Sequence, residues 1–198
     1  PMVSPMRIAC IHIPQYALQC VTRFDPSLRW TAAVVVGTLT PQIAGPHHAP
    51  VVIGCSRAAW HLGVRLGMTA TTARSTAPSA SIVGGEPALE RETARAVAEA
   101  LLGLSPNVDL GSRVGAARAH LALYAEVPSS VRGASFGSRA LERLGALGIT
   151  CRIGIADDRF TAWVAASHGG APAGPEHRGN DVVVVPRGGS AAFLAPLP

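Results

Sequence analysis

At 198 residues, with 48% of them apolar, the chain is long enough to bury a hydrophobic core of its own in one or two domains. It contains no run of about eighteen apolar residues and no leader typical of secretion, so we expect a soluble, cytoplasmic protein. The net charge of +5 comes from 17 basic residues, all of them arginine, against 12 acidic ones. Because the arginines are scattered, this charge favours a polyanionic partner only weakly.

Short apolar runs and amphipathic stretches alternate irregularly along the chain. The apolar runs predict strands at residues 7–13, 32–36, 51–55, 81–84, 107–110, 119–126, 150–155 and 182–185. Helical spacing and end signals predict helices at residues 15–24, 57–62, 69–75, 87–104, 135–147, 159–168 and 189–194. The mixture predicts an α/β (α+β) protein with a small strand and helix module inserted early.

Residue types at the helix ends support these predictions. Pro14 is expected in the first turn of the helix that follows it, where its missing N–H costs nothing. Ser56 is expected to cap a second helix, and Ser135 or Ser138 a later one. Gly148 is expected to end that later helix, because glycine readily adopts the left-handed conformation at a helix C-terminus.

The cysteines and histidines lack the spacing of a metal site. Three of the four widely separated cysteines fall in apolar runs; the four are Cys10, Cys20, Cys55 and Cys151. We therefore expect buried, reduced thiols and neither a bound metal nor another cofactor. His47 and His48 stand in a Gly- and Pro-rich loop with no third ligand nearby, which favours a plain loop.

Four segments, in order, resemble the palm and fingers of a Y-family (translesion) DNA polymerase: IACIHIPQYAL, CSRAAWHLGVRLGMTATTARSTAP, LSPNVD and GITCRIGIADDRFTAWVAAS. They span most of residues 7–168, and the second, with its G-V-x-x-G-M pattern before a short helix, is the most specific. FLAPLP resembles the lead-in to the family's thumb. Within the family, IHIPQYALQ and GVRLGMTATTAR resemble the ImuB group, the inactive polymerase-like subunits of bacterial mutasomes.

The resemblance implies a Y-family polymerase-like palm, which is a mixed, mainly antiparallel sheet with helices, interrupted by a small fingers module. We expect the palm to comprise residues 6–29 and 78–185 and the fingers residues 30–77. A truncated thumb is expected to begin at residues 186–198, so that the thumb proper, the little finger and the tail are absent from this sequence.

The acidic residues with which such polymerases hold two divalent ions are missing at the matching positions. The acid of the first strand and its companion two residues later fall on His12 and Pro14. The second acid pair falls on Ala117 and Arg118, and no Asp or Glu occurs at residues 110–125. Mg²⁺ prefers carboxylate oxygens, so the resemblance predicts no metal site. The simpler interpretation of His12 is a helix-entry histidine with a satisfied hydrogen bond.

The contacts to the incoming nucleotide are also reduced. The fingers tyrosine and arginine of active relatives fall on Arg57 and Trp60, while the basic residue of the palm is retained as Arg159. This predicts a degenerate nucleotide site. Further exposed arginines are candidates for weak contacts to DNA phosphates, with a solvated surface as the equally simple interpretation; they are Arg65, Arg74, Arg113, Arg118 and Arg132.

We therefore predict that the protein is not an enzyme but a non-catalytic scaffold in damage-induced translesion synthesis and mutagenesis. The resemblance implies three partners: a sliding clamp, an ImuA-like RecA-related protein and an error-prone C-family DNA polymerase. It also implies weak DNA binding and a bacterial, nucleoid-associated location when engaged. Two alternatives stay open: an active translesion polymerase with Asp109 or Glu126 as unusual metal ligands, and a small hydrolase built on Cys55 or Ser56.

Overall fold

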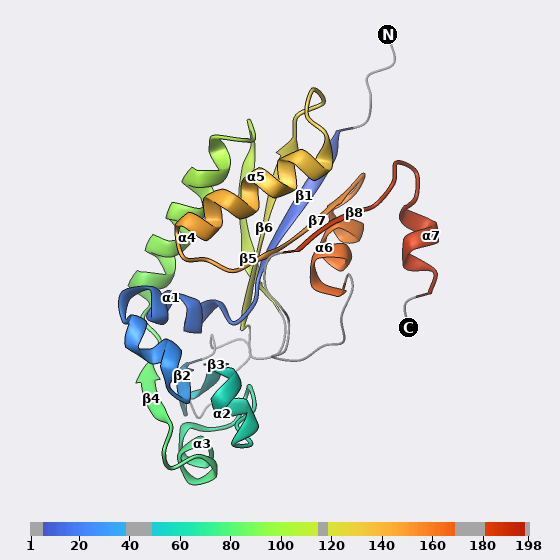
Figure 1. Ribbon diagram of the computed structural model, residues 1–198. Helices are drawn as coiled ribbons and strands as arrows, with labels where there is room; N and C mark the ends of the chain where they lie inside the picture. The colour runs from blue at the N-terminus through green and yellow to red at the C-terminus, as the bar shows by residue number, and fades with distance from the viewer. Residues whose placement is uncertain (1–5, 39–48, 115–118, 169–180, 197–198) are drawn as a thin grey trace. The chain divides into compact units, whose positions relative to one another are not determined.

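The computed structural model describes residues 6–38, 49–114, 119–168 and 181–196, in which strands and helices alternate (Figure 1). The strands are β1 (Arg7–Ile13), β2 (Ala33–Gly37), β3 (Val51–Cys55), β4 (Ser81–Gly84), β5 (Val108–Val114), β6 (His120–Val127), β7 (Arg152–Ala156) and β8 (Asp181–Val184). The helices are α1 (Tyr16–Phe24), the 3₁₀ helix η1 (Pro26–Trp30), α2 (Arg57–His61), α3 (Ala70–Thr76), α4 (Pro87–Leu102), α5 (Gly133–Ala146), α6 (Arg159–His168) and α7 (Ser190–Leu194).

The chain folds into two compact units. The first comprises Pro1–Ile13, Ala94–Ser112 and Ala122–Pro198, and the second comprises Pro14–Thr93 and Arg113–Leu121. This division follows contacts within the chain and does not test the boundaries predicted for palm, fingers and thumb, which stay a prediction.

The first unit is built on a five-stranded sheet with the strand order β5-β6-β1-β7-β8. β1, drawn in blue, lies in the middle of this sheet (Figure 1). It pairs antiparallel with β7, so that Cys10 lies opposite Gly154 and His12 opposite Arg152. β7 pairs in parallel with the edge strand β8. The run of five buried residues at the end of β1 is what its continuous apolar sequence predicts for a central strand.

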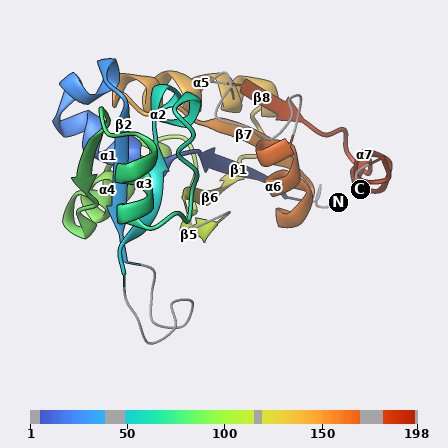
Figure 2. The same ribbon diagram turned by 90° about the horizontal axis from the view of Figure 1, so that it is seen from below.

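Two helices cover opposite faces of this sheet at β7. A Cβ added at Gly154 would overlap the carbonyl oxygen of Ala162 and the amide nitrogen of Ala166, so α6 lies directly against that glycine. A Cβ at Gly133 of α5 would instead lie 3.4 Å from the side chain of Ile155. Because neighbouring residues of a strand point to opposite faces, α5 and α6 lie on the two sides of β7, as Figure 2 shows.

The second unit contains a three-stranded sheet with the order β3-β2-β4. β2 pairs antiparallel with β3 and in parallel with β4, and a bulge interrupts the first pairing between Val35 and Val36. The α2 and α3 side of the sheet buries Val34 and Val52 against Ala59 and Ala73, among others. The α1 side buries Val35 and Ile53 against Ala17.

Most predicted elements are confirmed, several with identical bounds: residues 7–13, 51–55, 81–84 and 159–168. The mixed α and β architecture is confirmed, and all four cysteines are buried thiols. Gly148 has φ +74° just beyond α5 and ends that helix as expected. His47 and His48 lie outside the described residues. No helix in the described ranges is long and apolar enough to span a membrane.

Two predicted helix starts are wrong. Pro14 lies two residues before α1, because Gln15 adopts the left-handed conformation (φ 48°, ψ 44°) and the helix begins at Tyr16. The Gln15 side chain is held by the Cys55 amide, which donates to its Oε1 over 2.9 Å. α5 begins at Gly133 without a side-chain cap, so Ser135 and Ser138 lie inside the helix.

Asp158 caps α6 and makes the stability of the first unit sensitive to acid. Its carboxylate accepts hydrogen bonds from the Thr161 amide (2.8 Å), the Thr161 hydroxyl (2.7 Å) and the Ser190 hydroxyl (2.9 Å). These bonds, the one from the Thr161 amide first, hold the pKa of Asp158 below its ordinary value. The stabilisation is therefore complete above the ordinary pKa of an unfolded aspartate and is lost as the pH falls through the lower, folded value.

We predict that Asp158→Ala lowers the free energy of unfolding by about 1–2 kcal/mol near neutral pH, as expected for a lost N-cap. The loss should shrink as the pH falls below about 4, where the wild-type carboxylate also becomes protonated. Urea unfolding at several pH values measures both the loss of unfolding free energy and its dependence on pH. Asp25→Ala is a matched control, because Asp25 caps the exposed η1. A loss for Asp158→Ala that does not change with pH contradicts the prediction.

Candidate functional site

Four residues meet on one face of the five-stranded sheet, and we call them the Arg159 cluster: Cys10, Asp109, Tyr124 and Arg159. Arg159 is the first residue of α6, and its Nη2 donates to Oδ2 of Asp109 over 2.7 Å. Its guanidinium carbon lies 4.1 Å from the centroid of the Tyr124 ring. One arginine is thus held by a carboxylate from β5 and an aromatic face from β6.

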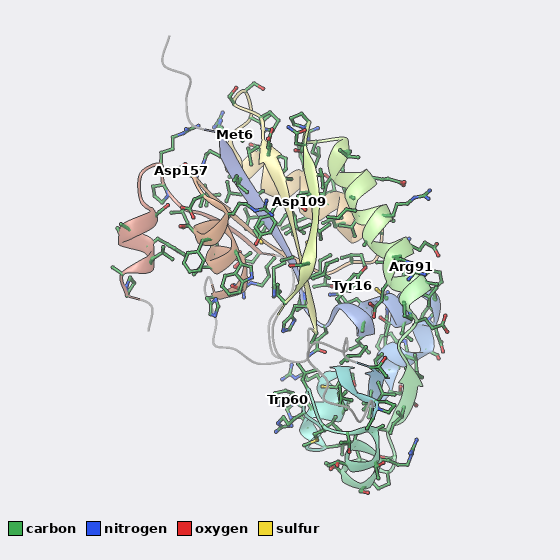
Figure 3. All side chains as sticks on the ribbon, turned by 180° about the vertical axis from the view of Figure 1, so that it is seen from behind. Met6, Tyr16, Trp60, Arg91, Asp109 and Asp157 are labelled. Atoms are coloured by element: carbon green, nitrogen blue, oxygen red, sulfur yellow. The ribbon has the colours of Figure 1, made fainter. Side chains whose placement is uncertain are left out.

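Asp109, labelled on β5 in Figure 3, is fixed by its own strand as well as by Arg159. Its Oδ1 accepts a hydrogen bond of 2.9 Å from the amide of Gly111. This bond, and then the hydrogen bond and charge of Arg159, hold the pKa of Asp109 below its ordinary value. The carboxylate is therefore anionic at neutral pH, and the cluster pairs one negative with one positive side chain.

The other two members are neutral. The Cys10 thiol hydrogen-bonds with the Tyr124 hydroxyl, and burial raises the pKa of Cys10 to about 12. Burial, and next the nearby Cys10, raise the pKa of Tyr124 to about 12 as well. Neither group ionises near pH 7, so they support Arg159 by packing and do not act as a nucleophile or a base.

Glu126 adds a second carboxylate to the same face. It lies two residues after Tyr124 on β6, and its Oε2 accepts a hydrogen bond of 2.8 Å from Nδ2 of Asn107. Asn107 in turn stands two residues before Asp109, which places both carboxylates on one side of neighbouring strands. Within the described residues, however, no group of three or more His, Cys, Asp or Glu side chains is placed to hold a metal ion.

The position predicted to have lost a metal-binding acid is buried. His12 is 6% exposed on β1 and lies opposite Arg152, which is 4% exposed and donates from Nη1 to the Ser167 carbonyl over 3.3 Å. An imidazole next to a buried guanidinium does not fit a magnesium ion. Ala117 and Arg118 lie outside the described residues, and Pro14 belongs to the second unit.

In the second unit, two predicted site residues, Arg65 and Trp60, are in contact, which the sequence did not predict. The Arg65 guanidinium carbon lies 4.0 Å from the centroid of the Trp60 ring, and its Nη1 donates to the carbonyls of Trp60 and Val64, each over 2.8 Å. Trp60 is labelled in Figure 3. Gly63, with φ +96°, turns the chain back between the two residues, just after α2. Arg57 donates to His61 over 3.3 Å.

The remaining predicted residues have plainer surroundings. Arg74 is exposed on α3, and the side chain of Arg113 is not among those described. Burial raises the pKa of Cys55 to about 11, so its thiol is not activated. The Ser56 hydroxyl accepts from the amides of Ala59 (3.3 Å) and Ala33 (2.9 Å), which makes it the predicted helix cap and leaves the hydrolase alternative without support.

A family model and a set of solved structures match the chain. Residues 11–167 match the family model described as IMS, the impB/mucB/samB family. No curated protein matches the chain. Among solved structures, an insertion ternary complex of Dbh DNA polymerase is similar with a TM-score of 0.74 and 19% identity, covering 97% of this chain and 52% of that one.

Two further structures are similar at nearly the same level. DinB from Sulfolobus solfataricus has a TM-score of 0.66 and 20% identity, covering 92% of this chain and 48% of that one. A Y-family DNA polymerase chimera has a TM-score of 0.67 and 19% identity, covering 92% and 49%. At these identities the likeness establishes the fold, the palm fold of Y-family polymerases. The chain spans about half the length of these structures.

The prediction that the protein is not an enzyme is wrong in the light of these comparisons. It was based on the acids missing at His12, Pro14, Ala117 and Arg118 and on the reduced nucleotide contacts, and those positions were taken to decide the class of the protein. The family model and the similar structures are those of DNA polymerases, and none of them indicates inactivity.

Proposed function

Because the chain belongs to the impB/mucB/samB family, we propose that it forms the palm and fingers of a Y-family DNA polymerase-like protein with a role in translesion DNA synthesis. The observation that carries the proposal is the fold, which the chain shares over 97% of its length with a DNA polymerase solved as an insertion ternary complex. The Arg159 cluster supports the proposal, because the guanidinium at the start of α6 is half-exposed and a guanidinium suits phosphate recognition.

The proposed ligand of this chain is primer–template DNA, held mainly through its phosphates. Arginines suit this role because the planar guanidinium matches the geometry of phosphate oxygens. The candidates in the described part of the chain are Arg159 and Arg132 in the first unit and Arg65 and Arg74 in the second. Because so few phosphates are neutralised, the binding is weak and depends strongly on salt.

The proposed partners come from the resemblance of the IHIPQYALQ and GVRLGMTATTAR segments to the ImuB group. They are a sliding clamp, an ImuA-like RecA-related protein and an error-prone C-family DNA polymerase, brought together at damaged DNA in a bacterial nucleoid. Pull-down of the chain against each purified partner tests this part of the proposal. A chain that retains none of the three contradicts it for these 198 residues.

We predict that the chain binds a labelled primer–template with a dissociation constant of roughly 1–100 μM at physiological salt, and more tightly at low salt. Arg159→Gln should weaken binding and lower the slope of log K against log salt by about 1. Arg95→Gln is the matched control, because Arg95 is also an exposed helical arginine in an ion pair, at 2.8 Å from Glu99. Fluorescence anisotropy measures both. Absence of DNA binding, or equal losses in the two variants, contradicts the proposal.

Primer extension tests the remaining alternative from the sequence, an active polymerase with Asp109 or Glu126 as metal ligands. Both carboxylates lie on one sheet face, although each already accepts a hydrogen bond from a neighbouring side chain. Nucleotide incorporation with Mg²⁺ or Mn²⁺ that is lost in both Asp109→Asn and Glu126→Gln would support this alternative. Incorporation that survives either substitution excludes that residue as an essential ligand.

A further inference from the structure

The ion pair of the Arg159 cluster has partners that are held in unequal ways. Asp109 is fixed by the strand itself, because the amide of Gly111 donates to its Oδ1 while Arg159 occupies only Oδ2. Arg159 reaches Asp109 at the end of a long side chain from the first turn of α6. Asp109 therefore has one hydrogen bond, from the Gly111 amide, that does not involve Arg159.

The Tyr124 ring gives Arg159 a second contact besides Asp109. The guanidinium carbon lies over the ring, 4.1 Å from its centroid, and this contact involves no atom of Asp109. The side chains of Arg159 and Asp109 are 54% and 53% exposed, so a ligand in solvent reaches the pair directly. Half-exposed pairs of this kind are weak and open easily.

We propose that Asp109 is an internal counter-ion that occupies Arg159 until a phosphate group displaces it. The phosphate accepts the Arg159 Nη2 hydrogen bond in place of Asp109 Oδ2, while Oδ1 keeps its bond to the Gly111 amide. The inference rests on the proposed function for its ligand, which is a phosphate of a nucleotide or of the DNA backbone. Asp109 is thus a positioning residue. It weakens phosphate binding in two ways: it pairs with Arg159, and its negative charge repels a nearby anion.

The test is calorimetric titration of the chain with inorganic tripolyphosphate, with a deoxynucleoside triphosphate and with primer–template DNA at low salt. Asp109→Asn keeps the shape of the side chain and an acceptor for the Gly111 amide, but it removes the charge. We expect it to tighten phosphate binding by about three- to tenfold, with a gain that fades as salt screens the charges. A gain with tripolyphosphate and the nucleotide assigns the site to a nucleotide, and a gain with DNA alone assigns it to the backbone.

Glu126→Gln is the matched control, since it removes the same charge from the same sheet face at a carboxylate paired with Asn107. It should change the affinities by less than about twofold. In an Arg159→Gln background the effect of Asp109→Asn should vanish. Unchanged or weaker binding by Asp109→Asn overturns the inference, as does a gain that persists without Arg159. DNA binding by the wild type is measured separately. A result that contradicts the counter-ion role of Asp109 therefore does not contradict the proposed function.

Discussion

Replacing Gly154 with alanine is expected to lower the free energy of unfolding by about 3 kcal/mol or more. The added methyl group meets backbone atoms, the Ala162 carbonyl oxygen and the Ala166 amide nitrogen, and these atoms cannot rotate away as a side chain could. α6 must therefore move outward from β7, opening a face that buries Ala162, Val164 and Ala165. Because α6 begins at Arg159, the same movement draws the guanidinium away from Asp109.

Gly145→Ala is the matched control for this prediction. Gly145 lies in α5, and a Cβ there meets nothing within 4 Å. Alanine has the better helix propensity, so this variant should be as stable as the wild type or more stable by up to about 1 kcal/mol. Urea unfolding followed by circular dichroism measures both. Gly154→Ala that unfolds at the wild-type urea concentration would show that α6 does not pack against β7 as described.

The fold was predictable where the sequence signal is local. The apolar run of β1 and the capping hydroxyl of Ser56 identify their elements without knowledge of the rest of the chain. The start of α1 was not predictable in this way, because Gln15 adopts its left-handed conformation with help from the Cys55 amide, 40 residues away. The start of α5 was also mispredicted. Two nearby serines are good capping residues, but the helix begins before both of them, at Gly133, without a side-chain cap.

The candidate site was predictable only in part. Arg159 was identified from the resemblance as a contact to the incoming nucleotide, but its partner Asp109 was considered as an unusual metal ligand. The two residues are 50 positions apart, and their contact requires knowing that β5 is in the same sheet as β1 and β7 and where α6 begins. Sequence spacing carries no information about such a pair. The prediction of an inactive protein failed for a different reason, because it inferred the class of the protein from substitutions at the metal and nucleotide positions, whereas the family match points to polymerases.

Gly111→Ala is expected to disturb the site and the fold together, at a cost of about 3 kcal/mol or more in unfolding free energy. Gly111 has φ +64°, a conformation that L residues adopt at a cost, and its missing Cβ would overlap the carbonyl oxygen of Ala122 on β6. β5 must separate from β6 to admit a methyl group. The amide of Gly111 then leaves Oδ1 of Asp109, and Asp109 moves away from Arg159.

Gly188→Ala separates conformational cost from steric overlap. Gly188 has a similar φ of +67°, but a Cβ there meets nothing within 4 Å. It should therefore cost only about 1 kcal/mol. The pKa of Asp109, followed by carboxyl ¹³C NMR, adds a readout specific to the site. It is held low by the Gly111 amide first and by Arg159 second, so it should rise toward its ordinary value in Gly111→Ala and stay low in Gly188→Ala. Equal stability losses with an unchanged Asp109 pKa would mean that Gly111 does not position this carboxylate, and the counter-ion role of Asp109 would then lack its anchor.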